Sequence, residues 1–160
     1  MMRYQIPHEI QGTTLVLHRI RRRHVITLRA IIKEMKPLIF PHPPKILHTN
    51  RIWFSNQSLI YVVEFNNAIV GWVGVRNVNL TTQSCSLEIV LSQIVWGTGV
   101  SVDVIQLMEY VVQTNLRLSI INIHINPDNK RAQRFFEKMN YLPQNIKKDQ
   151  KELLYRKHLN

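Results

Sequence analysis

A short glycine turn between a predicted strand and a predicted helix constrains this chain more than any other stretch. Residues 87–91 (LEIVL) are apolar and β-branched apart from one acid, as expected of a buried strand. From Val100 the apolar residues follow a helical period, and Gly97 and Gly99 lie between the two elements. Such a turn leaves the N–H groups at the helix start open to an anion such as a phosphate. It is neither a P-loop nor a Rossmann fingerprint, because no Gly-Lys-Ser/Thr follows and Val102 stands where a third glycine is needed.

Length and composition indicate one globular domain over residues 1–160. The chain is 45% hydrophobic and 19% charged, which is enough to form a core. A single cysteine, Cys85, excludes an internal disulfide framework and suits a reducing, cytoplasmic compartment. No signal peptide is visible, and no apolar run reaches the roughly 20 residues of a membrane span. We therefore expect a cytoplasmic protein with no membrane contact and no metal site.

The positive charge of the chain is large for its size. It has 21 Lys and Arg against 10 Asp and Glu, a formal net charge of +11. This balance favours polyanionic partners such as RNA, the ribosome, an acidic protein or a phosphorylated cofactor. A basic face in contact with solvent alone is the alternative. No basic stripe interleaved with aromatic residues is present, so a nucleic-acid-binding module is not the favoured reading.

The periodicity of the apolar residues predicts an α/β fold with a mixed sheet. The strands from Leu59 onward form an antiparallel meander, and a strand–helix–strand unit with a parallel pair follows it. We expect strands at Thr13–Ile20, Leu59–Phe65, Ala68–Val78, Cys85–Ser92, Leu118–Ile125 and Glu152–His158. We expect helices at Arg21–Lys36, Val100–Asn115 and Ala132–Met139, with a proline-rich loop from Lys36 to Ser58.

A second motif, Asn126 to Tyr141 (NPDNKRAQRFFEKMNY), lies downstream of Trp96-Gly97-Thr98-Gly99. In that order the two motifs resemble the GNAT superfamily of acyl-CoA N-acyltransferases. The pattern is most similar to the branch that includes ribosomal-protein N-terminal acetyltransferases. The resemblance covers residues 59–142 and implies a GNAT-like fold in which the two central strands splay apart.

The resemblance also implies a reaction and a site. Acetyl-CoA would donate its acetyl group directly to a primary amine, with a protein N-terminal amine, for example that of a ribosomal protein, as the favoured acceptor. Glu88 would be the catalytic base, acting directly or through an ordered water. The pyrophosphate would lie on the glycine turn, and the pantetheine arm would lie along the strand that ends at Leu91. The implied cofactor-binding residues are Ile89, Val90, Leu91, Trp96, Gly97, Thr98, Gly99, Val100, Ser101, Asn129 and Phe136.

Three positions depart from the family pattern. Ile94 stands where many members have Arg or Gln, and Phe136 where many have the tyrosine that protonates coenzyme A. Ser86 stands where relatives often carry their strand glutamate, although Glu88 lies on the same strand face. Two other functions remain open: a catalytically silent acyl-CoA-binding module, and an acetyltransferase acting on RNA-linked amines, which the net charge of +11 would suit. The sequence leaves a monomer and a homodimer equally open.

Overall fold

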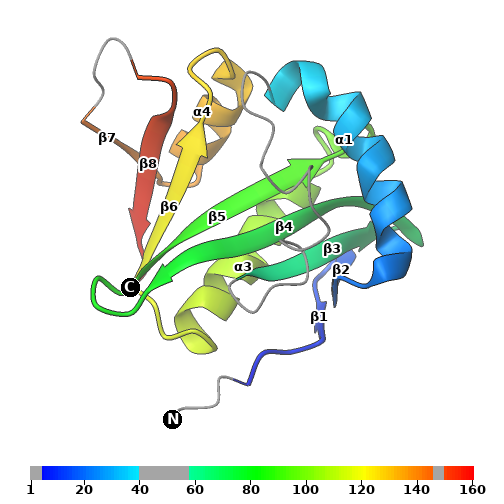
Figure 1. Ribbon diagram of the computed structural model, residues 1–160, viewed down its shortest axis with the longest axis horizontal. Helices are drawn as coiled ribbons and strands as arrows, with labels where there is room; N and C mark the ends of the chain where they lie inside the picture. The colour runs from blue at the N-terminus through cyan, green and yellow to red at the C-terminus, as the bar shows by residue number, and fades with distance from the viewer. Residues whose placement is uncertain (1–4, 40–57, 146–149) are drawn as a thin grey trace.

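The computed structural model describes residues 5–39, 58–145 and 150–160, and the structural statements below concern these residues. Eight strands form one sheet in the order β1-β2-β3-β4-β5-β6-β8-β7 (Figure 1). The strands are β1 (Glu9–Gln11), β2 (Leu15–Arg19), β3 (Leu59–Phe65), β4 (Ala68–Asn79), β5 (Ser84–Leu91), β6 (Ile120–Ile125), β7 (Leu142–Gln144) and β8 (Leu153–His158). The α-helices are α1 (Val25–Ile39), α3 (Val100–Thr114) and α4 (Lys130–Lys138).

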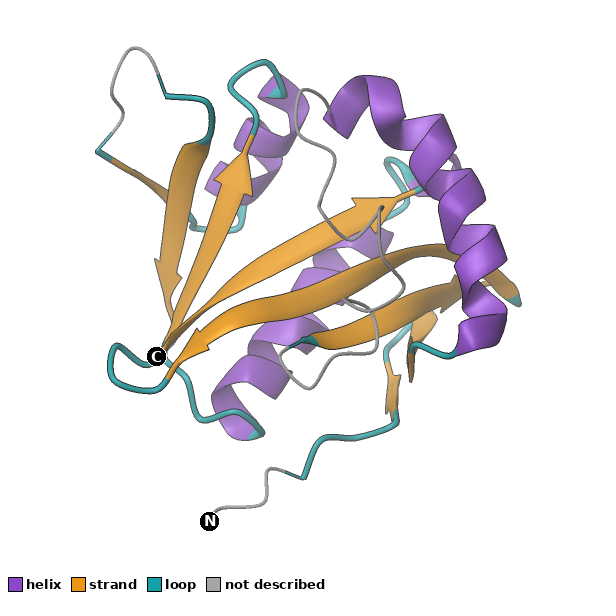
Figure 2. Cartoon of the chain, in the orientation of Figure 1, coloured by secondary structure: helices purple, strands orange, loops and turns teal. Residues whose placement is uncertain are grey.

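Helices cover both faces of the sheet (Figure 2). The apolar side of α1 packs with Trp72 and Val90 in one core cluster. On the other face, α3 and Phe136 of α4 belong to a larger cluster. Consecutive buried residues along β4 and β5 supply both clusters, because successive side chains of a strand point to opposite faces. Among the described residues, no helix combines the length and the apolarity that crossing a bilayer requires.

The predicted meander is present. Strands β3, β4 and β5 pair antiparallel in chain order. Asn66 and Asn67 join β3 to β4 at φ values of 50° and 61°, which Asn tolerates better than most residues. Asn140 has φ 66° one residue after Met139, the C-cap of α4, which agrees with the left-handed conformation predicted for it. These results confirm the mixed α/β fold class.

The N-terminal helix differs from its predicted limits. Arg22–His24 form a 3₁₀ turn, and α1 begins only at Val25. The reason is local: the Arg21 N–H donates to His24 Nδ1 at 3.0 Å and the His24 N–H donates to the Arg21 carbonyl at 2.9 Å, which closes a tight turn. The helix also continues past Pro37 to Ile39, so the proline does not end it. Most of the predicted proline-rich loop, residues 40–57, lies outside the described residues.

The sequence did not predict β1 and β7. Each has three residues and pairs with one neighbour at an end of the sheet, so an alternating pattern is hardly visible in it. The first predicted strand is shorter than expected because the Gly12 N–H donates to the Leu15 carbonyl at 2.9 Å, closing a turn between β1 and β2. The strand predicted from Leu118 begins at Ile120 as β6, and the last strand begins at Leu153.

The two central strands diverge, as the fold prediction required. Strand β5 pairs with β6 in parallel only where Ser84–Ser86 face Ile120–Asn122. Beyond this point β5 continues to Leu91 beside β4, while β6 continues to Ile125 beside β8. Figure 1 shows the two arrows separating from their common lower end. One edge of β5 from Leu87 onward therefore does not pair with β6.

Candidate active site

A cleft opens where β5 and β6 separate. It encloses a cavity of about 210 Å³ between β5, β6, the start of α4 and the residues before β8. The predicted site residues Glu88, Ile89, Val90, Asn129 and Phe136 all line it. The other lining residues are Asn77, Ser86, Leu87, Ile123, His124, Ile125, Asn126, Ala132, Lys151 and Glu152.

The edge of β5 that faces the cleft is where the sequence predicts the pantetheine arm of coenzyme A. In a sheet, the amide and carbonyl groups of such an edge form hydrogen bonds with the next strand. Between Leu87 and Leu91 the side of β5 that faces the cleft has no such pairing with β6. An amide-containing chain in the cleft can take those bonds, as a peptide does when it adds a strand to a sheet.

The glycine turn is where the sequence predicts the pyrophosphate. Gly97 and Gly99 have φ values of 77° and 87°, and a Cβ at either position would lie in open space. The first N–H groups of an α-helix have no acceptor within the helix and can bind phosphate oxygens, although that of Val100 here donates to Thr98 Oγ1 at 3.4 Å. Val100 is fully buried and Thr98 Oγ1 donates to the Val95 carbonyl at 2.5 Å. The Thr98 hydroxyl and the Val100 N–H are therefore both already used to shape the turn.

The carboxyl group of Glu88 lies in the wall of the cleft. Its Oε2 is 3.5 Å from Nη2 of Arg76, which comes from the neighbouring strand β4. The pKa of Glu88 is raised above its usual value, chiefly by burial and also by the Glu152 carboxylate, although Arg76 opposes the shift. Glu88 Oε2 is buried without a hydrogen-bond partner among the described residues. A carboxylate with a raised pKa can accept a proton, and Oε2 here has the Arg76 guanidinium as its neighbour.

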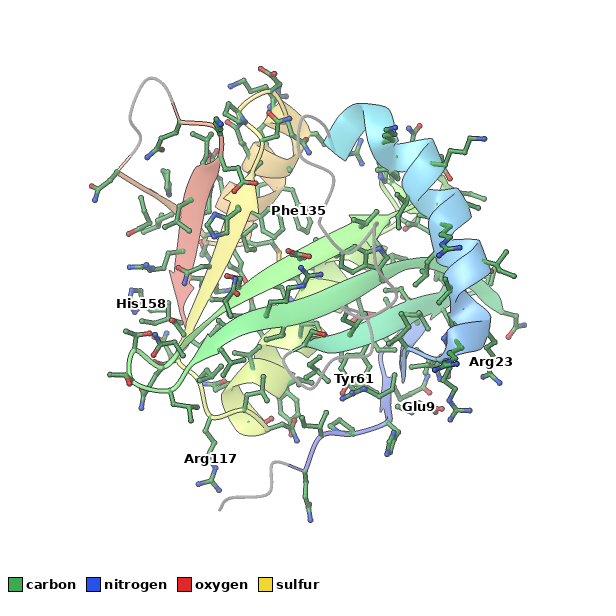
Figure 3. All side chains as sticks on the ribbon, in the orientation of Figure 1. Glu9, Arg23, Tyr61, Arg117, Phe135 and His158 are labelled. Atoms are coloured by element: carbon green, nitrogen blue, oxygen red, sulfur yellow. The ribbon has the colours of Figure 1, made fainter. Side chains whose placement is uncertain are left out.

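Asn129 and Phe136 form the α4 side of the cleft. Asn129 is the N-cap of α4, because its Oδ1 accepts a bond from the Ala132 N–H at 3.0 Å. Phe136 is 4% exposed and packs edge to face against Tyr141 and Phe135; Phe135 is labelled in Figure 3. The residues that line the described cleft include no tyrosine. Tyr141 is fully buried and donates to Glu109 Oε1 at 2.9 Å, so its hydroxyl is already used.

The sequence prediction missed several residues of the cleft. His124 Nδ1 lies 3.6 Å from Glu152 Oε2 at the rim, and Lys151 lines the same wall. Arg76 could have been found from strand alternation only once its register opposite Ser86 was known. Arg131 stacks on Trp96 with its guanidinium carbon 3.7 Å from the ring centroid. A contact between a turn and a later helix leaves no signal in the spacing of residues.

Comparisons with known proteins identify the family of this chain. The model of the acetyltransferase (GNAT) domain family matches residues 14–141. No curated protein matches the chain at a significant level.

Solved structures share the fold at low sequence identity. Spermidine N-acetyltransferase from Vibrio cholerae, in complex with CoA and spermine, has a TM-score of 0.72 and 17% identity, covering 91% of this chain and 94% of that one. Mycobacterium smegmatis RimJ, in complex with CoA-disulfide, has a TM-score of 0.72 and 16% identity, covering 90% and 81%. An acetyltransferase from Agrobacterium tumefaciens has a TM-score of 0.74 and 15% identity, covering 99% and 98%.

Proposed function

The chain belongs to the GNAT acetyltransferase family and uses acetyl-CoA, and we propose that its acceptor is a protein N-terminal amine. The proposal treats residues 1–160 as one such domain, in the cytoplasm. The observation that carries it is the cleft between β5 and β6, where a strand edge that does not pair with β6 lies beside the carboxyl group of Glu88. The likeness to RimJ supports the ribosomal-protein branch as the place to look for the acceptor.

The residues of the cleft have separate roles in a direct transfer of the acetyl group. Acetyl-CoA supplies a thioester carbonyl that a neutral amine can attack, with coenzyme A thiolate leaving. The β5 edge and the glycine turn fix the position of the cofactor, which converts a bimolecular encounter into an oriented reaction. Glu88 Oε2 takes the proton that the amine loses. A base of this kind contributes about 10²–10⁴-fold to the rate.

No tyrosine lines the described cleft to protonate the coenzyme A thiolate as it leaves. A thiolate with a solution pKa near 8.5, like that of a free cysteine, does not need a proton at the moment of departure. The Asn129 side-chain amide and nearby backbone N–H groups are donors that can stabilise the developing negative charge. Water can then protonate the thiolate.

A test of the acceptor measures acetyl-CoA turnover with matched amines. The panel holds peptides with free N-termini, the same peptides with blocked N-termini and a single lysine, and spermidine. We expect the free N-terminal peptides to have the highest kcat/KM. Faster acetylation of spermidine or of the lysine peptides would overturn the N-terminal acceptor and leave the acetyltransferase activity intact.

A binding module is the second candidate, and Phe136 is the observation that favours it. The aromatic ring closes the α4 side of the cleft without an acidic hydroxyl. A protein that binds coenzyme A and acetylates no amine in the panel would have this function.

The third candidate, an RNA-linked amine, draws on the net charge of +11. It predicts faster turnover with an aminoacyl-tRNA than with the free amino acid ester, and loss of that advantage at high salt.

A further inference from the structure

The contact between Arg131 and Trp96 connects the two sides of the cofactor site. Trp96 belongs to the turn between β5 and α3, and Arg131 lies in the first turn of α4. The guanidinium carbon is 3.7 Å from the centroid of the indole ring, which is a stacking distance. These two residues are far apart in the chain, and their contact places a cation against the residue that precedes Gly97.

The glycine turn has no cation of its own. Residues 92–101 (SQIVWGTGVS) contain no Lys or Arg, and Ile94 is 79% exposed. Asp103 is the acid in the first turn of α3, and its Oδ2 accepts hydrogen bonds from the Thr14 N–H and the Thr14 hydroxyl, each at 3.4 Å. A doubly charged pyrophosphate on this turn therefore needs positive charge from another element.

The position of Arg131 is unfavourable for α4 itself. The first turn of that helix carries Lys130 and Arg131 and no acid, although the dipole of a helix favours negative charge there. Stacking on Trp96 uses the flat face of the guanidinium and leaves its N–H groups free at the edges. Those edges match the geometry of phosphate oxygens, which guanidinium binds in pairs.

We propose that Arg131 binds the pyrophosphate of coenzyme A and that Trp96 is the positioning residue that holds its guanidinium over the glycine turn. This inference rests on the proposed use of the turn as the cofactor seat. It assigns to α4 the charge that the turn lacks, and it explains why a tryptophan precedes Gly97.

Calorimetry with coenzyme A tests the role of Arg131. Arg131→Gln should weaken binding about 10- to 100-fold, because hydrogen bonds to charged groups are worth roughly 1.5–3 kcal/mol. Arg134→Gln, an exposed change in the same helix, is the matched control and should bind like the wild type. Equal affinities of Arg131→Gln and wild type would overturn the inference. A wild type that does not bind coenzyme A would instead overturn the cofactor seat itself.

Truncated cofactors identify the phosphate. Dephospho-coenzyme A keeps the pyrophosphate and lacks the 3′-phosphate, whereas pantetheine lacks both. The loss caused by Arg131→Gln should persist with dephospho-coenzyme A and disappear with pantetheine. Disappearance with dephospho-coenzyme A would assign Arg131 to the 3′-phosphate, and persistence with pantetheine would exclude a phosphate contact; either result overturns the proposal.

A double-mutant cycle tests the positioning role of Trp96. Trp96→Leu should weaken coenzyme A binding, whereas Trp96→Phe should keep most of the affinity because it retains a ring face. In the double variant, the losses of Trp96→Leu and Arg131→Gln should be less than additive. Additive losses would show that Trp96 acts independently of Arg131. Circular dichroism and thermal melts of each variant confirm that it is folded, so that a lost affinity reports on the site.

Discussion

The carboxyl group of Glu88 is under two opposing influences. Burial and the Glu152 carboxylate raise its pKa, while Arg76, 3.5 Å away, favours the charged form. A raised pKa makes a carboxylate a better base, provided that the pH stays above it. The same shift means that the native state holds this proton more tightly than the unfolded chain does. The contribution of Glu88 to stability is therefore lost as the pH rises from the ordinary pKa of glutamate through the raised value.

The pH dependence of the reaction tests whether Glu88 is the catalytic base. As the pH falls through the raised pKa, the base is protonated, so kcat/KM should decline at a higher pH than an ordinary glutamate would give. We expect Glu88→Gln to lower turnover at least about tenfold, to abolish that inflection, and to leave coenzyme A affinity nearly intact. Initial rates between pH 5 and pH 9 provide the measurement. Equal rates for both proteins would make Glu88 a structural residue.

Phe136 tests whether the site needs an acid. The ring is 4% exposed and packs against Tyr141 and Phe135, so it fills space as well as lining the cleft. We expect Phe136→Tyr to change turnover less than about tenfold in either direction, because the thiolate can leave unprotonated. Initial rates measure this, and a thermal melt controls for packing. A wild type without activity that gains it through this substitution would support the binding module.

Among the helices and strands, the sequence predicted those long enough to show a period of apolar residues and missed those that depend on local or tertiary contacts. The meander and the βαβ unit were predictable because their strands and helices are long enough to show a period. The two three-residue strands lack that length, and the 3₁₀ turn depends on a His24 side-chain bond that no pattern reveals. Of the candidate site, the sequence could indicate the glycine turn and Glu88, whereas the contact of Arg131 with Trp96 depends on tertiary packing.

The turn between β5 and α3 depends on the conformation of its glycines. At φ 87° a valine at position 99 would be strained by about 1–3 kcal/mol, and its side chain would enter the open space over the turn. We expect Gly99→Val to weaken coenzyme A binding at least about tenfold by calorimetry. Gly99→Asn tolerates the backbone conformation and separates the two causes: recovery identifies strain, and continued weakness identifies the filled space. Unchanged affinity in folded Gly99→Val would remove the turn from the cofactor site.

Helix α1 holds the start of the same turn from the other side of the sheet. Ser92 Oγ donates to both Glu34 carboxylate oxygens, at 3.0 and 3.1 Å, and the Gln93 N–H donates to Oε1 at 3.0 Å. Ser92→Ala should therefore lower the free energy of unfolding by about 1–2 kcal/mol, because Ser92 is buried and its bond is to a charged group. Urea denaturation measures the loss. Glu34→Gln should retain part of the bonding, and a larger loss than in Ser92→Ala would contradict this account.

The molecule as a whole consists of two pieces of sheet that share a short seam. Strands β1–β5 lie on one side and β6, β8 and β7 on the other, and between β5 and β6 only Ser84–Ser86 and Ile120–Asn122 pair (Figure 2). The cofactor is expected to occupy the gap beyond this seam. Its amides would then replace strand pairing that the sheet lacks, so binding should complete the structure as well as prepare the reaction.

Hydrogen exchange and thermal melts test whether bound coenzyme A stabilises the sheet along the edge of β5. At a coenzyme A concentration of one hundred times Kd, binding adds about 2.7 kcal/mol, which raises Tm by about 5–11 °C in a chain of this length. Amides of β5 from Leu87 to Leu91 should exchange more slowly with coenzyme A present. Amides of β2, which lies three strands from the cleft, should change less and serve as the internal control. Uniform protection of β2 and β5 would mean that the cofactor stabilises the fold globally, and would contradict binding along the free edge of β5.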